Sequence, residues 1–313
     1  FINDILNILL LDLQNFKSKK ALFMRNLLKV NGFLPYLAIA FLNASVDLAH
    51  KITIQNVLLK TYSGDTLFIL TAVINAMILL PFIFLFSPSS FINDKFAKTK
   101  VIRICAVFGV VISVAVLVSY LLGAFGVAFA LTLILAAQSA IYSPAKYGII
   151  KALVGTERLG TANGIIQALT IVAILVSSFL FSFIFENLYI QGENSEEILK
   201  SVYPIGIFLV VFSALEAFFA YKLPYISETN EQNGEFELKR YISLSYLREN
   251  LKEVRSDKNI WLSIAGLSIF WGISQIIIAA FPAHYKAVFN DDSSLAVQAI
   301  LAVSAIGIAF GSY

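Results

Sequence analysis

Long apolar stretches decide what this chain can fold into. A helix that crosses a membrane needs roughly 20 mainly apolar residues, because about 1.5 Å of rise per residue must cover about 30 Å of hydrocarbon. The 313-residue chain is 58% hydrophobic and 14% charged, with a mean hydropathy of +0.81, so a lipid bilayer is the expected solvent. We therefore predict an all-α, multi-pass membrane protein whose eight spanning helices lie near residues 34–59, 66–87, 101–122, 124–142, 161–185, 202–222, 259–285 and 294–313.

Lys and Arg residues are distributed unevenly between the two ends of these predicted helices. They concentrate before residue 34, in the second and fourth connections, and in the long polar segment 223–258. The opposite helix ends carry Lys60, Lys200 and Lys286. Because cytoplasmic flanks hold the excess of positive charge in membrane proteins, we expect the amino terminus and the long segment to be cytoplasmic.

The long polar segment also divides the chain, since six predicted helices precede it and two follow it. The chain begins with Phe1 and ends inside an apolar stretch, so we expect it to be part of a longer protein. The predicted parts are a cytoplasmic tail that could form an interfacial helix (1–33), a six-helix bundle (34–222), a cytoplasmic linker (223–258) and the start of a second, truncated bundle (259–313).

The first predicted helix carries polar side chains spaced four residues apart, which places them in one row along the helix, with His50 beside the row. A charged side chain that faces lipid at mid-bilayer costs at least about 2.5 kcal/mol, so the row is expected to face a bundle interior or a wet cavity. Two interpretations stay open: the row lines a substrate route, or Asp47 and Lys51 neutralise each other and lock the packing. The row consists of Asn43, Asp47, Lys51 and Gln55.

Two later helices offer matching polar faces. Asn163 and Gln167 lie four residues apart in the fifth predicted helix, and Trp271 and Gln275 do so in the seventh. Each pair could line a cavity, but hydrogen bonds between spanning helices would explain it equally well. Glu216 in the sixth predicted helix is expected to form a structural ion pair with another helix and is left out of the predicted site.

Several chemistries find no support in the sequence. With one Cys and two His, no disulfide framework, metal site or cofactor site is predicted. The His-x4-Asp pair of acyltransferases is absent, because Gln55 follows His50 and Phe289 follows His284 at that spacing. The long segment has no phosphate-binding or nucleic-acid motif. No catalytic residue and no nucleic-acid partner are therefore expected in these residues.

The second connection contains "SSFINDKFAKTK", residues 89–100. It resembles the loop motif of the major facilitator superfamily, with Asp94 and Lys95 at the acidic and basic places and Lys98 following. The usual glycines and one basic position of the motif are replaced. An ordinary positive-inside loop would explain the cations but not Asp94, so we predict a gating loop that contains Asp94, Lys95 and Lys98.

The fourth connection, with "SPAKYG" at 143–148, resembles the lysophospholipid transporter branch of that superfamily, including members fused to an acyl-acyltransferase. "FLNASVDLAHK" at 41–51 and "FWG" at 270–272 are similar to the same branch. The resemblance implies the major facilitator fold, with about eight of twelve helices present, and it places Asp47 and Lys146 on the substrate path or its gate. Free-standing members tend to have an Arg where this chain has Gln275, so an Arg-based charge lock is not carried over.

The resemblance implies transport of lysophospholipid, such as lysophosphatidylethanolamine, from the outer to the inner leaflet of a bacterial inner membrane by alternating access. The implied partners are the phospholipid bilayer, the lysophospholipid and a fused or associated acyltransferase with acyl carrier protein. In that reading Lys51 or Lys146 meets the head-group phosphate and Asp47 meets its ammonium. Two alternatives stay open: an exporter of drugs or small metabolites, and the membrane half of a bifunctional acyltransferase.

Overall fold

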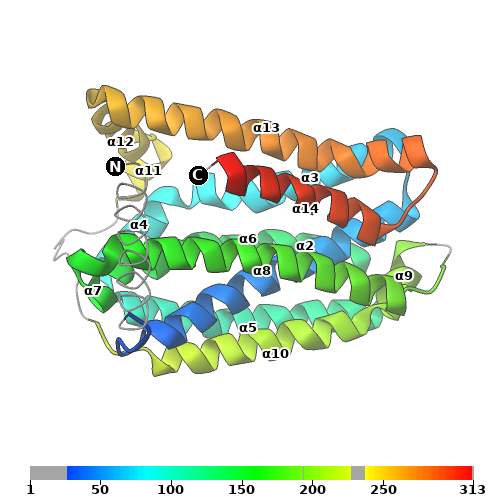
Figure 1. Cartoon of the computed structure of the whole chain (residues 1–313), viewed down its shortest axis with the longest axis horizontal. Coiled ribbons are helices and arrows are strands. Elements are labelled where there is room, and N and C mark those ends of the chain that lie inside the picture. The colour runs from blue at the N-terminus through cyan, green and yellow to red at the C-terminus, as the bar shows by residue number, and fades with distance from the viewer. Residues whose placement is uncertain (1–26, 193, 227–236, 312–313) are drawn as a thin grey trace, which may run out of the picture.

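The computed structural model describes residues 27–192, 194–226 and 237–311, with side chains up to Val303. Every regular element in these residues is a helix, and the long helices run side by side along one direction (Figure 1). The predicted tail helix, at residues 1–16, lies outside the described residues. The predicted all-helical membrane architecture is confirmed.

Seven helices of the described chain are long and apolar enough to cross a membrane. An eighth, α14, is apolar, but its described side chains extend only from Ser294 to Val303. The prediction of eight spans therefore holds for seven and is met in part by the last. The eight helices are α2 (Phe33–Thr61), α3 (Gly64–Phe84), α5 (Lys98–Leu122), α6 (Phe125–Gly148), α8 (Leu159–Leu188), α10 (Tyr203–Lys222), α13 (Lys258–Phe289) and α14 (Ser294–Gly311).

Short helices occupy several of the predicted connections. The expected gating loop is largely helical, because α4 follows α3 almost directly, and the expected fourth connection begins later than predicted, because α6 continues to Gly148. The short elements are α4 (Phe86–Lys95), α7 (Ile150–Val154), the 3-10 helix η1 (Thr156–Arg158), α9 (Ser195–Ser201), α11 (Leu238–Ile242) and α12 (Ser245–Ser256).

Helix α2 is the central element of the fold. In its most apolar window 61% of residues are buried, against 6% for α13, and it packs against both α8 and α10. Two apolar clusters surround it: one near its Phe33 end includes Tyr36 and Tyr142, and the other, toward its Thr61 end, includes Tyr120. Polar side chains of α2 therefore lie inside protein.

Hydroxyl and amide side chains fix how neighbouring spanning helices are rotated. The Ser113 and Ser213 hydroxyls lie 2.7 Å apart between α5 and α10, and Ser177 of α8 donates to Ser45 of α2 at 2.9 Å. Such bonds are favourable in lipid because the membrane core offers no water as an alternative partner. They fix α5 against α10 and α8 against α2.

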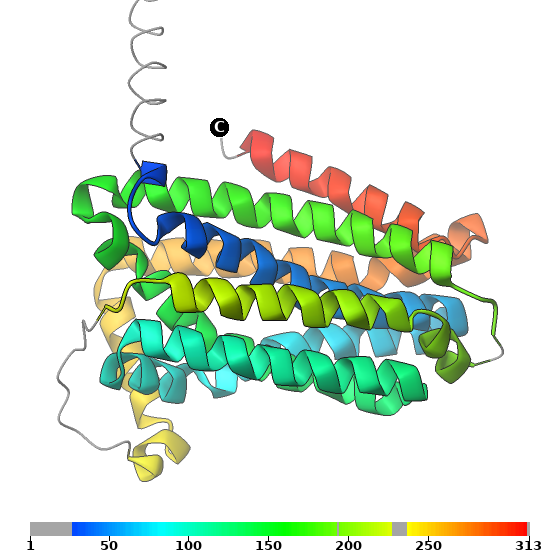
Figure 2. The same ribbon diagram turned by 90° about the horizontal axis from the view of Figure 1, so that it is seen from below.

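The linker helices lie across the Phe33 end of the bundle, roughly perpendicular to the long helices (Figure 2). The Tyr241 hydroxyl of α11 donates to the Phe84 carbonyl at the end of α3, at 2.5 Å. The carboxylate of Asp257 then caps α13 by accepting from the backbone N–H groups of Asn259 and Ile260. This end of the structure is the one predicted to be cytoplasmic.

Candidate functional site

The polar row of α2 faces the interior of the helix bundle. Asn43 is 4% exposed and Gln55 is 9% exposed, while Asp47 and Lys51 are half-buried. Asn43 and Gln55 are therefore covered by other parts of the protein, and Asp47 contacts Ser139 of α6. These three residues point into the bundle as predicted, and their place on a substrate route stays a prediction.

Asp47 and Lys146 belong to one group of polar side chains between α2, α6 and α10. The Ser139 hydroxyl donates to Asp47 Oδ2 at 2.8 Å, and Asp47 Oδ1 is buried without a hydrogen-bond partner. The Lys146 ammonium donates to Asn43 Oδ1 at 2.7 Å and interacts electrostatically with Asp47 and Glu216. We call Asn43, Asp47, Ser139, Lys146 and Glu216 the polar centre.

Lys146 reaches the polar centre because α6 continues through Pro144. The sequence placed Lys146 in a loop, which is wrong: it lies in the last turn of α6, and its side chain packs over the Tyr142 ring at 5.5 Å from the centroid. The Tyr36 hydroxyl of α2 donates to the Lys146 carbonyl at 2.9 Å. A residue of α2 thus satisfies a carbonyl in the final turn of α6 and fixes where that turn lies.

Glu216 is a member of the polar centre that sequence reasoning left out. It is 3% exposed in α10, it interacts with Lys146, Asn43 and Tyr142, and its Oε1 atom has no hydrogen-bond partner. Among the described residues Glu216 has no ion pair within 4 Å, so the expected structural ion pair is not found. The Lys146 ammonium instead attracts both Glu216 and Asp47 electrostatically from a greater distance. The sequence did contain a signal for Glu216 as a site residue, because an acidic residue within an apolar span usually has a functional role.

Lys51 has no ion pair with Asp47, although the two are one helical turn apart. In the part of the chain that the structure describes, its ammonium has no hydrogen-bond or ion-pair partner within the usual distances. The alternative in which these two residues neutralise each other is therefore not what the structure contains. One face of α2 instead presents an ammonium and a carboxylate oxygen that are both unpaired.

His50 lies on a different side of α2 from Lys51. It is fully buried, and its two ring nitrogens are 2.9 Å from the Tyr120 hydroxyl and 3.1 Å from the Thr132 hydroxyl. These partners belong to α5 and α6. The ring has no free nitrogen for a substrate in this conformation, which departs from its expected place on the route.

The remaining predicted polar faces do not join the polar centre. Asn163 and Gln167 are exposed on α8, Trp271 is 52% exposed on α13, and Gln275 is partly exposed. None of their side chains has a hydrogen bond to the polar centre among the described residues. Their expected part in a route stays a prediction.

The predicted gating residues lie on α4 and at the start of α5. Ser89 and Asn93 of α4 are buried and donate to backbone carbonyls of α6, which pins the short helix in place. Asp94 is partly exposed in the last turn of α4, next to the exposed Lys95, and Lys98 begins α5. All three lie at the Phe33 end, and a gating role remains a prediction.

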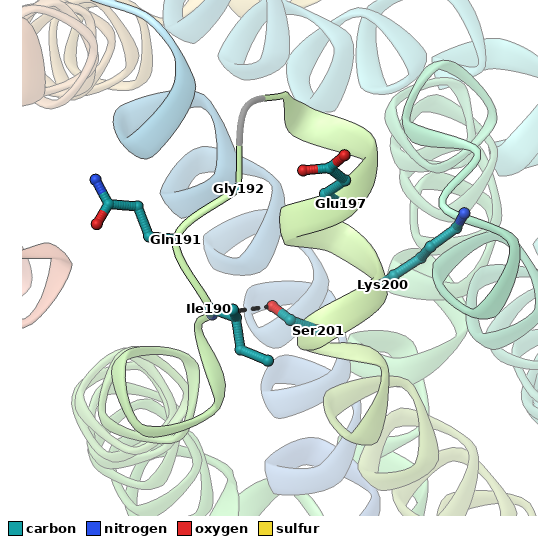
Figure 3. Close-up of a pocket in the computed structure, with 6 residues that line it drawn as sticks. All are labelled: Ile190, Gln191, Gly192, Glu197, Lys200 and Ser201. Carbon is teal, nitrogen blue, oxygen red and sulfur yellow. Dashed lines mark hydrogen bonds between the residues drawn. The ribbon is translucent and has the colours of Figure 1, made fainter.

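A pocket of about 310 Å³ lies at the opposite end, between the α8–α9 connection and α9 (Figure 3). It contains no predicted site residue. Among the described residues, no group of three or more His, Cys, Asp or Glu side chains is placed to hold a metal ion. The pocket is lined by Ile190, Gln191, Gly192, Glu197, Lys200 and Ser201.

Comparison with known proteins gives two matches of different extent. A model of the Major Facilitator Superfamily matches residues 30–313. The lysophospholipid transporter LplT of Photorhabdus laumondii subsp. laumondii is 33% identical to this chain over 135 residues. That similarity covers 43% of this chain and 30% of the length of the transporter. The family match spans nearly the whole chain, whereas the match to the transporter spans less than half of it.

Proposed function

The chain belongs to the Major Facilitator Superfamily and is a multi-pass transporter of that family, and from this premise we propose that it carries lysophospholipids across a membrane. The proposed cargo is a lipid such as lysophosphatidylethanolamine, moved from the outer to the inner leaflet of a bacterial inner membrane for re-acylation. The partial similarity to LplT supports this cargo. An acyltransferase that acts with acyl carrier protein, fused or separate, would complete the process.

One observation carries the proposal: inside a span, α2 presents an ammonium without a partner and a carboxylate with one unbonded oxygen. The Lys51 ammonium is unpaired among the described residues, and Asp47 Oδ1 is buried without a hydrogen bond. A lysophosphatidylethanolamine head group carries a phosphate and an ammonium. Lys51 supplies a donor for the first and Asp47 an acceptor for the second.

The polar centre supports the same cargo by holding Asp47 in place. Ser139 orients one carboxylate oxygen and leaves the other unbonded, while Lys146 is shared with Glu216 and Asn43. A charged head group that crosses lipid unaided loses its water and costs many kcal/mol. Fixed charges of both signs offset that cost, and the apolar walls of the spanning helices suit a single acyl chain.

Isosteric variants of the two charges test the proposal. Asp47→Asn and Lys51→Met are made in the full-length protein, and uptake of radiolabelled lysophosphatidylethanolamine into spheroplasts is measured. Each is expected to lower uptake about tenfold or more, because an unpaired charge is left on the lipid. The matched controls are Asp65→Asn, at an exposed helix start, and Lys252→Met, on exposed α12.

Head-group chemistry separates the two roles. Lysophosphatidylglycerol has a phosphate but no ammonium, so its uptake should fall with Lys51→Met and change much less with Asp47→Asn. Unchanged uptake of both lipids in both variants would contradict the proposal. Efflux of a cationic dye that depends on a pH gradient, in a chain inactive toward lysophospholipid, would identify an exporter instead.

A further inference from the structure

Helix α12 (Ser245–Ser256) lies crosswise at the Phe33 end of the bundle and packs against α11 and α13. It runs roughly perpendicular to the long helices (Figure 2). Because the long helices cross the bilayer, a helix perpendicular to them runs parallel to the membrane surface. The Phe33 end is the one predicted to be cytoplasmic, so α12 is expected at the inner surface of the membrane.

One face of α12 is apolar and largely uncovered. Leu247, Leu251 and Val254 are spaced by four and three residues, so they lie along one side of the helix, and we call them the apolar face. Leu247 is 46% exposed and Leu251 is 39% exposed, whereas Val254 is half-buried. At the corner between α11 and α12, Ile242 and Leu244 are 70% and 53% exposed. Exposed apolar area is costly in water, so these side chains call for an apolar environment that the described residues do not supply.

Two arginines run along one edge of the apolar face. Arg248 and Arg255 are seven residues apart, so they lie one above the other on the helix, and we call them the basic edge. Both are exposed, and among the described residues neither guanidinium has a carboxylate within 4 Å. The basic edge is therefore open to an anionic partner.

The acidic side chains of α12 point away from the apolar face. Glu249 and Glu253 are four residues apart and share the other side of the helix with Lys252. Glu249 is already engaged, because its two carboxylate oxygens accept from Arg240 of α11, both at 2.8 Å. Carboxylates thus do not line the basic edge and would not repel an anion bound there.

Neighbouring contacts hold α12 at the level of the membrane surface. The Arg255 guanidinium lies over the Trp261 ring, 4.7 Å from its centroid, in the first turn of α13. Tryptophan is enriched where spanning helices pass between lipid head groups and acyl chains. The Tyr241 hydroxyl of α11 donates to the Phe84 carbonyl and ties the other end of the linker helices to α3. The basic edge is therefore placed at head-group height.

We propose that α12 is an interfacial helix whose basic edge binds the phosphates of acidic phospholipids at the inner membrane surface, while its apolar face enters the acyl-chain boundary. The inference goes beyond the proposed cargo and does not depend on it. A guanidinium donates two hydrogen bonds to one phosphate, and surfaces rich in acidic lipid attract basic segments.

The pattern of side chains favours a lipid surface over a protein as the occupant. An amphipathic helix that lies in the interface has an apolar face, basic residues beside it and its remaining polar side toward water. Leu251, Arg248 and Lys252 meet these three requirements in turn on α12. The helix also already runs parallel to the membrane, so no rearrangement of the bundle is needed for docking.

Lipid quenching of a fluorophore on α12 tests the proposal without any transport assay. The full-length protein, with its native cysteines replaced, carries Leu251→Cys labelled with an environment-sensitive fluorophore. It is reconstituted into vesicles of phosphatidylcholine, alone or with roughly 30% phosphatidylglycerol, that contain a lipid spin-labelled near its head group. We expect quenching to be at least about twofold stronger with phosphatidylglycerol, because the acidic lipid draws the helix in.

Matched variants separate the two faces and the two charges. A fluorophore on Lys252→Cys, one residue away on the side turned to water, should be quenched little in either vesicle. In the Leu251→Cys protein, Arg248→Gln should remove about half of the gain from phosphatidylglycerol, whereas Lys252→Gln should leave it unchanged. All of these positions are exposed, so the variants are expected to fold.

Three results would overturn the proposal. The first is a fluorophore at position 251 that is not quenched in either vesicle, which includes the case where a second copy or another part of the protein covers the apolar face. The second is equal quenching at positions 251 and 252. The third is quenching that is the same with and without phosphatidylglycerol. Since no lysophospholipid is used, failure of the proposed cargo leaves this test intact.

Discussion

Replacing His50 by Ala tests whether this side chain packs the bundle or lines the route. The ring is fully buried, and both nitrogens are engaged, by the hydroxyls of Tyr120 and Thr132. The replacement removes both contacts and leaves a cavity between α2, α5 and α6. We expect a large loss of stability and little change in transport per folded molecule.

The magnitude follows from the contacts. A hydrogen bond between membrane helices is worth about 0.6 kcal/mol on average, so the two contribute about 1 kcal/mol. Truncating a large buried side chain adds about 2 to 3 kcal/mol for the cavity and the lost packing. The sum, about 3 to 4 kcal/mol, corresponds to a fall in Tm of roughly 10 °C for a chain of this size.

The assay is thermal unfolding of the purified full-length protein in detergent, with lysophospholipid uptake normalised to the folded fraction. His50→Gln, which can keep one of the two hydrogen bonds, should give an intermediate Tm. His284→Ala is the control, because His284 is exposed on α13. An unchanged Tm together with lost uptake in His50→Ala would refute the packing role and return His50 to the substrate route.

Three further predictions concern single positions. Glu216→Gln removes one of the two carboxylates that attract the Lys146 ammonium, and we expect uptake to fall severalfold while the protein stays folded, as measured by uptake and gel filtration. Gly32→Ala should lower Tm markedly, because φ is +87° and an added Cβ would lie 2.4 Å from Pro224 Cδ. Ser113→Ala should lower the free energy of unfolding by only about 0.6 kcal/mol, measured by denaturant titration, since a single bond to Ser213 is lost.

The spanning helices could be predicted from the sequence because the bilayer fixes their length and polarity. Predicted and observed boundaries of α5 and α10 differ by a few residues. The predicted end of α6, at residue 142, was wrong for a physical reason. Proline is tolerated in spanning helices when neighbours satisfy the freed backbone groups, and α6 continues through Pro144 to Gly148.

The polar row of α2 was predictable, but its neighbours were not. Successive residues on a helix are about 100° apart, so His50 and Lys51 cannot face the same side. The sequence placed His50 beside the row, and only its partners on α5 and α6 decide which way it points. Glu216 and Lys146 are far apart in the chain, so their meeting at Asp47 depends on how three helices pack and on nothing local.

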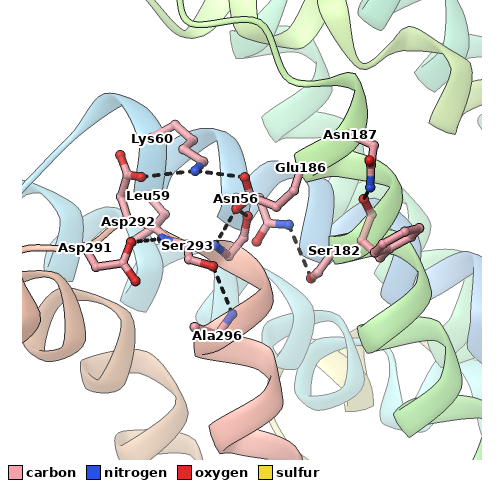
Figure 4. Close-up of polar contacts among 12 residues, drawn as sticks. Asn56, Leu59, Lys60, Ser182, Glu186, Asn187, Asp291, Asp292, Ser293 and Ala296 are labelled. Atoms are coloured by element: carbon pink, nitrogen blue, oxygen red, sulfur yellow. Dashed lines mark hydrogen bonds and ion pairs between the residues drawn. The ribbon is translucent and has the colours of Figure 1, made fainter.

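The charged side chains of α2 lie at two separate positions along the helix, around Asp47 and at Lys60. Asp47 and Lys60 are 13 residues apart, about 20 Å along the helix. The polar centre is built wholly from α2, α6 and α10, so it keeps its contacts whichever way α13 and α14 move. Lys60, in contrast, pairs with Asp292 in the α13–α14 connection (Figure 4), so that contact depends on where the later helices lie. Energetic coupling is small beyond about 10 Å when no partner is shared. Substitutions at Asp47 and at Lys60 are therefore expected to have independent, additive effects on stability.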